Sequence, residues 1–315
     1  MNNIKIIATE SLGVRGLCCS VGTTDKKIVI DPGISLGYIR NGRLPHPVQI
    51  AVDEIIRNQI IEELNDATDI VFSHYHGDHV PLADANPYQL ALKEAEAPLK
   101  ELKVWAKGLK NESHKMQERG WNLKMSSVHF TVSEGKNNGL LQFSKPVPHG
   151  KRNTHLGNVM MTKIKFKDMI FLHASDIQFL CSDTIDYIIK LKADVVLASG
   201  PPIYLNHLEK EDLKRASQNI LKLSEKVETL IVDHHLLRCE EGLSYLKKIN
   251  RQSKNKIICA ADYMEVKPQL LEARREEIYN KLPVLEDWHE KYKKGEVSTE
   301  PYLQKARELI KDFIY

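Results

Sequence analysis

Three histidines and one aspartate are crowded into the stretch FSHYHGDHV, as His74, His76, Asp78 and His79. Imidazole nitrogen and carboxylate oxygen are the ligands that suit zinc. The glycine in this stretch lets the backbone bend, so that His74 and His76 can point to one place and Asp78 and His79 to another. Two adjacent ligand pairs from one loop are what a dinuclear site needs, with metals about 3.5–4 Å apart.

The histidine-rich stretch directly follows TDIVFS, residues 68–73, which has the length and β-branched composition of a buried strand. A chance cluster on a surface loop is the simpler alternative. The position argues against it, because side chains that directly follow a strand lie at the rim of a sheet, where active sites are commonly built. The pattern therefore predicts a metal site.

One loop cannot close two metal sites, so further ligands must come from other strand ends. His149 lies in KPVPHG, Asp176 in FLHASDIQ, and His234 and His235 in LIVDHHLLR, each after an expected strand. Each also has a structural alternative. His149 could be an ordinary loop histidine, Asp176 could cap a helix beginning near Leu180, and one of the paired histidines could belong to the core. These residues leave open whether His234 or His235 is the last ligand.

The elements that must position these residues are short strands and amphipathic helices. Helical spacing of apolar residues predicts helices over about 48–64, 208–227 and 240–249. The first strands are close together, which favours antiparallel hairpins, whereas later strands alternate with helices. The mixture predicts an α/β fold in which helices cover two sheets. The expected strands are at 4–9, 17–21, 26–31, 68–73, 158–166, 169–175, 194–199, 229–234 and 256–260.

Two segments stand apart from this pattern. Residues 81–135 read as a polar, partly helical insert, and residues 262–315 as a helical C-terminal extension packed on a domain spanning 1–261. Solvated helical decoration is the simpler interpretation of both. The alternatives are that basic residues of the insert, such as Lys115 and Arg119, meet an anionic substrate, and that the C-terminal helices form a homo-oligomer.

Composition sets broad limits on the class of protein. Hydrophobic residues make up 42% and charged residues 28% of the 315-residue chain, as in ordinary globular proteins. The net charge of +3 is too small to argue for nucleic acid as a partner, or against it. The five cysteines are scattered, and no apolar run approaches the roughly 20 residues of a membrane span. We therefore expect a cytoplasmic protein with reduced thiols and no membrane partner.

The ligand candidates resemble those of the metallo-β-lactamase superfamily, over about residues 4–260. The order is the same: an aspartate after an early strand (Asp31 in IVIDPG), then HYHGDH, His149, Asp176 and a histidine that ends a late strand. More narrowly, the chain looks like an archaeal family of uncharacterised predicted metal-dependent hydrolases. The resemblance implies a four-layer αββα sandwich with the metals at one rim of the two sheets.

The resemblance also implies a role for each candidate. Asp176 would bridge two metals. The DHHLLR stretch is similar to the T-H-x-S-x-R pattern of the transfer-RNA 3′-processing branch, which places the last ligand at His234 and leaves His235 beside it for proton transfer. Asp31 would orient a ligand through hydrogen bonds, and His155 would line the site. The expected ligands of the first metal are His74, His76 and His149, and those of the second are Asp78, His79 and His234.

The superfamily members that use two irons for redox chemistry carry Glu where this chain has His76, so we expect two zinc ions instead. The predicted reaction is attack by a hydroxide bridged by the two zinc ions, with Asp78 positioning it and His235 protonating the leaving group. A phosphodiester or other ester in a small or nucleotide-like molecule is the expected substrate. A lactone or thioester hydrolase and a non-catalytic metal-binding interaction protein are the alternatives.

Overall fold

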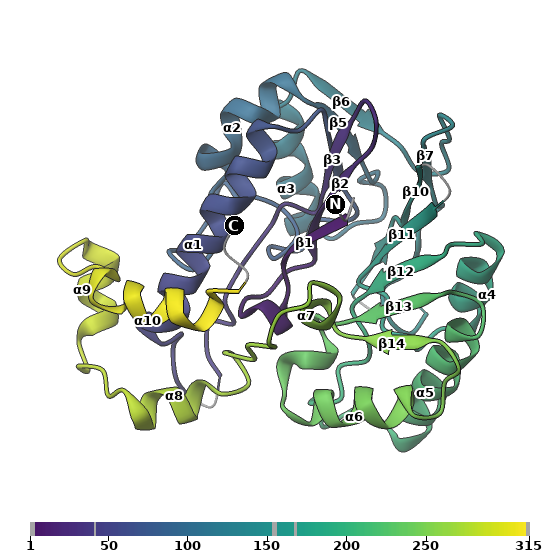
Figure 1. Cartoon of the computed structure of the whole chain (residues 1–315). Coiled ribbons are helices and arrows are strands. Elements are labelled where there is room, and N and C mark those ends of the chain that lie inside the picture. Colours follow the sequence, from purple (N-terminus) through teal and green to yellow (C-terminus); the bar gives the residue numbers. More distant parts are fainter. Residues whose placement is uncertain (1–3, 41, 153–155, 167–168, 313–315) are drawn as a thin grey trace.

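Two six-stranded mixed sheets form the centre of the computed structural model, which describes residues 4–40, 42–152, 156–166 and 169–312. In Figure 1, α1 and α2 lie outside the first sheet, and α4, α5 and α6 lie outside the second. The expected four-layer αββα sandwich is thereby confirmed. Among the described residues, no helix combines the length and the apolar content that crossing a bilayer requires.

The first sheet begins with antiparallel strands and continues with parallel ones. β1 to β3 pair as hairpins, and β3, β4, β5 and β6 then run parallel. β4 is buried at every position, as expected for a parallel strand covered on both faces. In spatial order the strands are β1 (Ile4–Ala8), β2 (Cys18–Gly22), β3 (Lys27–Ile30), β4 (Asp69–Phe72), β5 (Lys103–Ala106) and β6 (His129–Val132).

The second sheet has the same mixed character. β7, β10 and β11 are antiparallel neighbours, and β11 to β14 are parallel. A separate two-stranded pair, β8 (Val147–Pro148) and β9 (Asn158–Val159), leads into His149. In spatial order the main strands are β14 (Lys256–Ile258), β13 (Thr229–Val232), β12 (Val195–Ala198), β11 (Met169–Ser175), β10 (Thr162–Phe166) and β7 (Leu141–Phe143).

Helices follow most of the parallel strands, because a parallel pair needs a crossover connection. The α-helices are α1 (Pro47–Asn65), α2 (Leu92–Glu101), α3 (His114–Met125), α4 (Ser182–Lys190), α5 (Lys210–Ser224), α6 (Glu241–Asn250), α7 (Ala260–Tyr263), α8 (Arg275–Lys281), α9 (Trp288–Lys294) and α10 (Glu300–Ile310). Two 3₁₀ turns are η1 (Glu10–Leu12) and η2 (Leu236–Arg238), and both lie beside the histidine cluster.

The segment 81–135, read from its composition as a polar, partly helical insert, contains strands of the first sheet as well as helices. It contributes α2 and α3, but also β5 and β6, which extend the first sheet. β6 is the edge strand, and its residues are exposed or half-buried. An edge strand with polar residues lacks the apolar run by which buried strands are recognised, so the sequence pattern missed it.

Of the C-terminal helices, α10 packs against α1 (Figure 1). His46 caps the start of α1 by accepting a hydrogen bond at Nδ1 from the backbone of Val48, and its Nε2 lies 2.8 Å from the carbonyl oxygen of Leu282. Tyr292 of α9 donates a hydrogen bond to Glu54 of α1 at 2.7 Å. These contacts join the C-terminal segment to the first helical layer.

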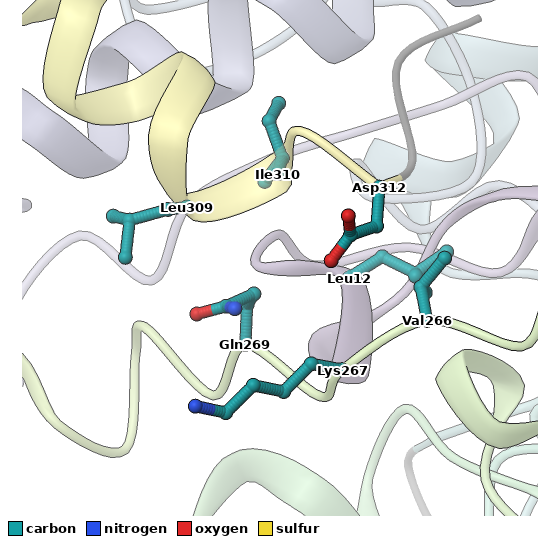
Figure 2. A pocket seen from close by; sticks show the side chains of 7 residues that line it. All are labelled: Leu12, Val266, Lys267, Gln269, Leu309, Ile310 and Asp312. Atoms are coloured by element: carbon teal, nitrogen blue, oxygen red, sulfur yellow. The ribbon is translucent and has the colours of Figure 1, made fainter.

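A small cavity lies where the end of α10 meets the beginning of the chain. Its volume is about 10 Å³, close to the room that one water molecule needs. This cavity is too small for an organic substrate. Figure 2 shows that the side chains lining it come from Leu12, Val266, Lys267, Gln269, Leu309, Ile310 and Asp312.

Candidate metal centre

The candidate site lies where four parallel strands from the two sheets end together. Asp31 follows β3, His74 follows β4, Asp176 follows β11 and His234 follows β13. Among the described residues, Asp31, Ser175 and His234 have positive φ angles of 48°, 55° and 25°. Non-glycine residues in this region are strained and cluster at functional sites, where surrounding contacts hold them. The backbone is therefore turned sharply at three points of one rim.

His74, His76, His149 and Asp176 converge on one point. The Nε2 atom of His74 is 3.0 Å from Nδ1 of His76, and Nε2 of His149 is 2.9 Å from Oδ2 of Asp176. His74 Nε2 and Asp176 Oδ2 are 3.5 Å apart. Four donors placed tetrahedrally about 2.1 Å from zinc would be about 3.4 Å from one another. The spacing therefore suits one divalent cation, and we refer to this point as the first position.

Asp78, His79 and His234 converge on a second position beside the first. His79 Nε2 and His234 Nε2 are 3.4 Å apart, and His234 Nε2 is 3.5 Å from Asp78 Oδ2. The other oxygen of Asp176, Oδ1, lies 3.1 Å from His79 Nε2 and 3.5 Å from His234 Nε2. One carboxylate therefore presents Oδ2 to the first position and Oδ1 to the second, as a bridging ligand would.

The ring orientations of three histidines also fit metal binding. His74 Nδ1 is 2.9 Å from the Ser73 hydroxyl, His79 Nδ1 is 3.0 Å from Asp31 Oδ2, and His234 Nδ1 is 2.7 Å from Glu10 Oε2. In a neutral ring whose Nδ1 carries the proton, Nε2 has a free lone pair. Each outward hydrogen bond therefore turns a lone pair toward the two positions. The donor set fits two divalent cations, and zinc is suited to it.

Asp31 connects both positions to the two sheets. Its Oδ1 accepts the backbone N–H of Ser73 at 2.8 Å, and its Oδ2 accepts from the Ser73 hydroxyl as well as from His79. The Ser73 and Ser175 hydroxyls are 2.7 Å apart, and they belong to different sheets. This buried chain of hydrogen bonds sets the orientation of His74 and His79 together.

The charges of the site are set by burial and by close neighbours. Burial raises the pKa of the Asp176 carboxyl, but His79, His234, His235 and His149 lower it well below its usual range. Burial and the neighbouring His79 and His76 lower the pKa of His74 to about 3. At neutral pH the site therefore offers an ionised carboxylate and a neutral imidazole, which are the forms that bind metal.

A buried arginine lies against the second position. Arg238 Nη2 is 2.8 Å from His234 Nε2 and 3.2 Å from Asp78 Oδ2, while its Nε donates to Glu10 Oε1 at 2.7 Å. Burial lowers the pKa of Arg238, but Glu10, Tyr204 and Asp78 raise it well above its usual range. The guanidinium is therefore charged. Burial is the main cause that lowers the pKa of His234, and the charge of Arg238 lowers it further.

The two positions are open to solvent on one side. The side chains of His76, Asp78 and His235 are 22%, 17% and 12% exposed, whereas His149 and Asp176 are 1% exposed. Structural zinc sites are closed by protein ligands, and catalytic sites keep a side for water or substrate. One side of the two positions is therefore accessible to water.

The structure brings together all seven residues that the sequence predicted as ligands. Asp176 does not cap a helix, since α4 begins at Ser182 with Cys181 before it. His234 faces the second position, and His235 Nε2 lies 3.2 Å from Asp176 Oδ2, on the side of the first position. His155 lies outside the described residues. The ligand candidates that meet at the two positions are His74, His76, Asp78, His79, His149, Asp176 and His234.

Sequence reasoning missed four residues that contact the ligands: Glu10, Ser73, Ser175 and Arg238. Arg238 ends the DHHLLR stretch, so a signal for it was present. Glu10 had none, because its 3₁₀ turn lies 224 residues from His234 in the chain. Arg119 of α3, considered above as a substrate contact, donates to the carbonyl of Tyr75 at 3.0 Å and so supports the ligand loop.

Comparisons with known proteins place the chain among archaeal relatives. It is 45% identical over 301 residues to the UPF0282 protein of Methanosarcina mazei, a match that covers 95% of this chain and 99% of the relative. The UPF0282 protein of Methanocaldococcus jannaschii is 35% identical over 289 residues, or 86% of this chain and 94% of that protein. No family model matches the chain.

A solved structure described as a metal-dependent hydrolase of the β-lactamase superfamily covers 81% of this chain and 95% of its own length. Its TM-score is 0.48 at 14% sequence identity.

Proposed function

The chain belongs to the UPF0282 protein family, and we propose that it is a zinc-dependent hydrolase that cleaves an ester bond, with a phosphodiester ranked before a carboxylic ester. The observation that carries the proposal is the position of Asp176. Its buried carboxylate presents one oxygen to each of two groups of ligands, 2.9 Å from His149 and 3.1 Å from His79. Asp176 Oδ1 accepts no hydrogen bond within the described residues, which is costly for a buried carboxylate unless a cation lies there.

Two divalent cations bound at these positions would lower the pKa of water toward neutrality and neutralise the negative charge that develops on the attacked group. The chain supplies the geometry for this chemistry. Asp78 is ionised, because His79, His234 and Arg238 outweigh the effect of burial and lower its pKa well below the usual range. Its carboxylate at the open side can orient an attacking water by accepting a hydrogen bond.

His235 is the proposed partner of the leaving group. Its ring is 12% exposed at the open side, and its Nδ1 has no hydrogen-bond partner among the described residues. Burial and Arg238 lower its pKa to about 3, so the imidazole is neutral before substrate binds. Negative charge that arrives with a substrate would raise that pKa, because an opposite charge nearby favours the protonated ring. His235 can then take up a proton and pass it to the leaving oxygen.

The open side also separates this proposal from a non-catalytic metal-binding protein. A site that only stabilises the fold would be closed, yet His76 and Asp78 are partly exposed. Of the C-terminal helices, which could have formed an interface with a partner, α10 packs against α1 of the same chain. A catalytic role therefore explains these residues better than metal binding alone.

The proposal is tested by metal analysis and by a substrate panel. Purified protein should hold two zinc ions per chain and hydrolyse at least one of three generic substrates: a 4-nitrophenyl phosphodiester, an aliphatic lactone or a thioester. A chelator should abolish the activity, and zinc should restore it. The variant His76→Ala should lose zinc and activity together, whereas His129→Ala, a change on the edge strand β6, should alter neither. Full zinc content and full activity in His76→Ala would contradict the proposal.

A further inference from the structure

A path of polar contacts leads outward from the second position to a cation on the surface. Arg238 Nη1 is 3.4 Å from the hydroxyl of Tyr204, and the backbone carbonyl of Arg238 accepts a hydrogen bond from Arg40 Nη2 at 2.8 Å. The guanidinium of Arg40 lies 5.0 Å from the centre of the Tyr204 ring. Arg40 and Tyr204 are therefore one contact beyond Arg238, which itself touches Asp78 and His234.

Arg40 has no carboxylate partner among the described residues, unlike Arg15 and Arg238. Arg15 is paired with Glu272, and Arg238 is paired with Glu10. Within the part of the chain that the structure describes, no carboxylate lies within 4.0 Å of the Arg40 guanidinium. A guanidinium has five N–H donors, and the described contacts of Arg40 use one of them. With respect to the described residues, its charge and most of its donors are available to a ligand.

Tyr204 adds a second donor at the same place. Its oxygen can accept the hydrogen bond from Arg238, so its own hydrogen can point elsewhere. Its half-buried ring holds the Arg40 guanidinium by a cation–π contact, which orders a long side chain that would otherwise be mobile. An arginine fork and a phenol hydroxyl side by side suit the oxygens of a phosphate or a carboxylate.

We propose that Arg40 and Tyr204 form a subsite for an anionic group of the substrate, a phosphate or a carboxylate that is separate from the ester being cleaved. This inference rests on the proposed function, because it takes the second position as the place of reaction. The preferred substrate is then an ester that carries a second negative charge.

The test compares substrates that differ only in this second charge. One pair is thymidine 3′-phosphate 5′-(4-nitrophenyl phosphate) and thymidine 5′-(4-nitrophenyl phosphate). The other pair is mono-4-nitrophenyl glutarate and 4-nitrophenyl butyrate. For each pair, the ratio of kcat/KM for the member with the additional anionic group over the member without it is measured in zinc-loaded wild-type protein, Arg40→Ala, Arg40→Lys and Tyr204→Phe.

We expect Arg40→Ala to lower this ratio about tenfold in at least one pair, Arg40→Lys to restore part of it, and Tyr204→Phe to lower it less. A change in the nucleotide pair alone identifies phosphate, and a change in the glutarate pair alone identifies carboxylate. Arg43→Ala is the matched control, since Arg43 comes from the same turn but lies over the ring of Tyr279 at 5.0 Å. An equal ratio in wild type and Arg40→Ala for both pairs would overturn the subsite.

A binding measurement separates failure of the subsite from failure of the proposed function. Calorimetric titration with thymidine 3′,5′-bisphosphate and thymidine 5′-monophosphate, and with glutarate and butyrate, needs no turnover. If wild-type protein prefers the member of a pair that carries the additional anionic group and Arg40→Ala loses that preference, the subsite stands even if none of the esters is hydrolysed. If esters are hydrolysed but neither preference depends on Arg40, the subsite is wrong and the hydrolase proposal is untouched.

Discussion

Glu10, in the first 3₁₀ turn of the chain, accepts a hydrogen bond at 2.7 Å from Nδ1 of His234, which follows a strand of the other sheet. The same carboxylate accepts from Nε of Arg238 at 2.7 Å. One buried side chain therefore fixes the ring of a candidate metal ligand and the guanidinium beside it. The two sheets are joined at the second position by this contact.

We predict that Glu10→Gln weakens binding at the second position by about 10- to 100-fold, the usual effect of losing a carboxylate behind a histidine ligand. The amide keeps the volume but removes the charge that holds His234 and Arg238. Competition with a chromophoric chelator would show one zinc released at much lower chelator concentration than the other. Glu63→Gln, a change at a carboxylate paired with Lys27 far from the histidines, is the control. Identical titrations for wild type and Glu10→Gln would contradict the role of Glu10.

The second prediction concerns the bridging carboxylate. Asp176→Asn should reduce the zinc content from two ions to at most one per chain and lower turnover by at least about 100-fold, because the amide lacks the charge that both positions share. The amide nitrogen would also bring a donor against the histidines. Elemental analysis after dialysis measures the zinc content. Asp186→Asn, at an exposed carboxylate paired with Lys222, should retain both ions. Two tightly bound ions in Asp176→Asn would refute the bridging role.

The third prediction separates His234 from His235. His234 Nε2 faces His79 and Asp78 at 3.4 and 3.5 Å, whereas His235 Nε2 faces Asp176 at 3.2 Å on the side of the first position. His234→Ala should lose one zinc ion. His235→Ala should retain two zinc ions and lower turnover by about 10- to 100-fold. The loss should be largest for substrates with a poor leaving group, as expected when a proton donor is removed. Loss of zinc from His235→Ala but not from His234→Ala would reverse the assignment.

A fourth prediction concerns stability. Without metal, the lone pairs of His74, His76 and His149 and the charge of Asp176 are held within a few ångströms of one another. Bound zinc should therefore raise the free energy of unfolding by about 2.7 kcal/mol at a free zinc concentration 100 times the dissociation constant. The unfolding temperature should rise with it. Thermal unfolding of chelated and zinc-loaded protein measures this shift. His76→Ala should show a smaller shift, and an equal shift would mean that zinc binds elsewhere.

The sequence pointed to the candidate ligands that the structure brings together, but not to the residues that support them. Each candidate follows a strand within two residues or lies in the HYHGDH stretch, and polar residues in such places are visible as interruptions of apolar runs. Glu10 and Ser175 hold ligands through contacts between residues far apart in the chain, and no local pattern marks such a contact. Because each sheet places its parallel strand ends at one rim, the fold class alone was enough to bring Asp176 to His74.

The edge of the first sheet shows the opposite case. β5 and β6 lie in a segment rich in charged residues, and their exposed positions break the apolar periodicity on which strand prediction depends. The expected strand over 158–166 is likewise divided into β9 and β10, with Met160 and Met161 between them. There the chain passes from the small β8–β9 pair to the second sheet, a change of partner that composition does not show.

The last prediction concerns the attachment of the C-terminal helices. His289 of α9 lies between two phenols, with Nδ1 3.1 Å from the hydroxyl of Tyr88 and Nε2 2.8 Å from that of Tyr279. Burial and the nearby Lys293 lower the pKa of His289 to about 4. In the unfolded chain the pKa is near 6.5, so between about pH 6.5 and 4 the unfolded state binds a proton that the folded state does not. The free energy of unfolding therefore falls as the pH falls through this range.

The size of this effect can be measured with His289→Gln, because glutamine retains a donor and an acceptor for the two tyrosines but does not titrate. Denaturant unfolding of chelated protein at pH 7 and pH 4.5 should show that wild type loses about 2 kcal/mol more stability than the variant. The other histidines contribute equally to both proteins and cancel in the difference. Equal losses in the two proteins would mean that His289 is protonated as readily when folded, and that the phenols do not hold it in the neutral form.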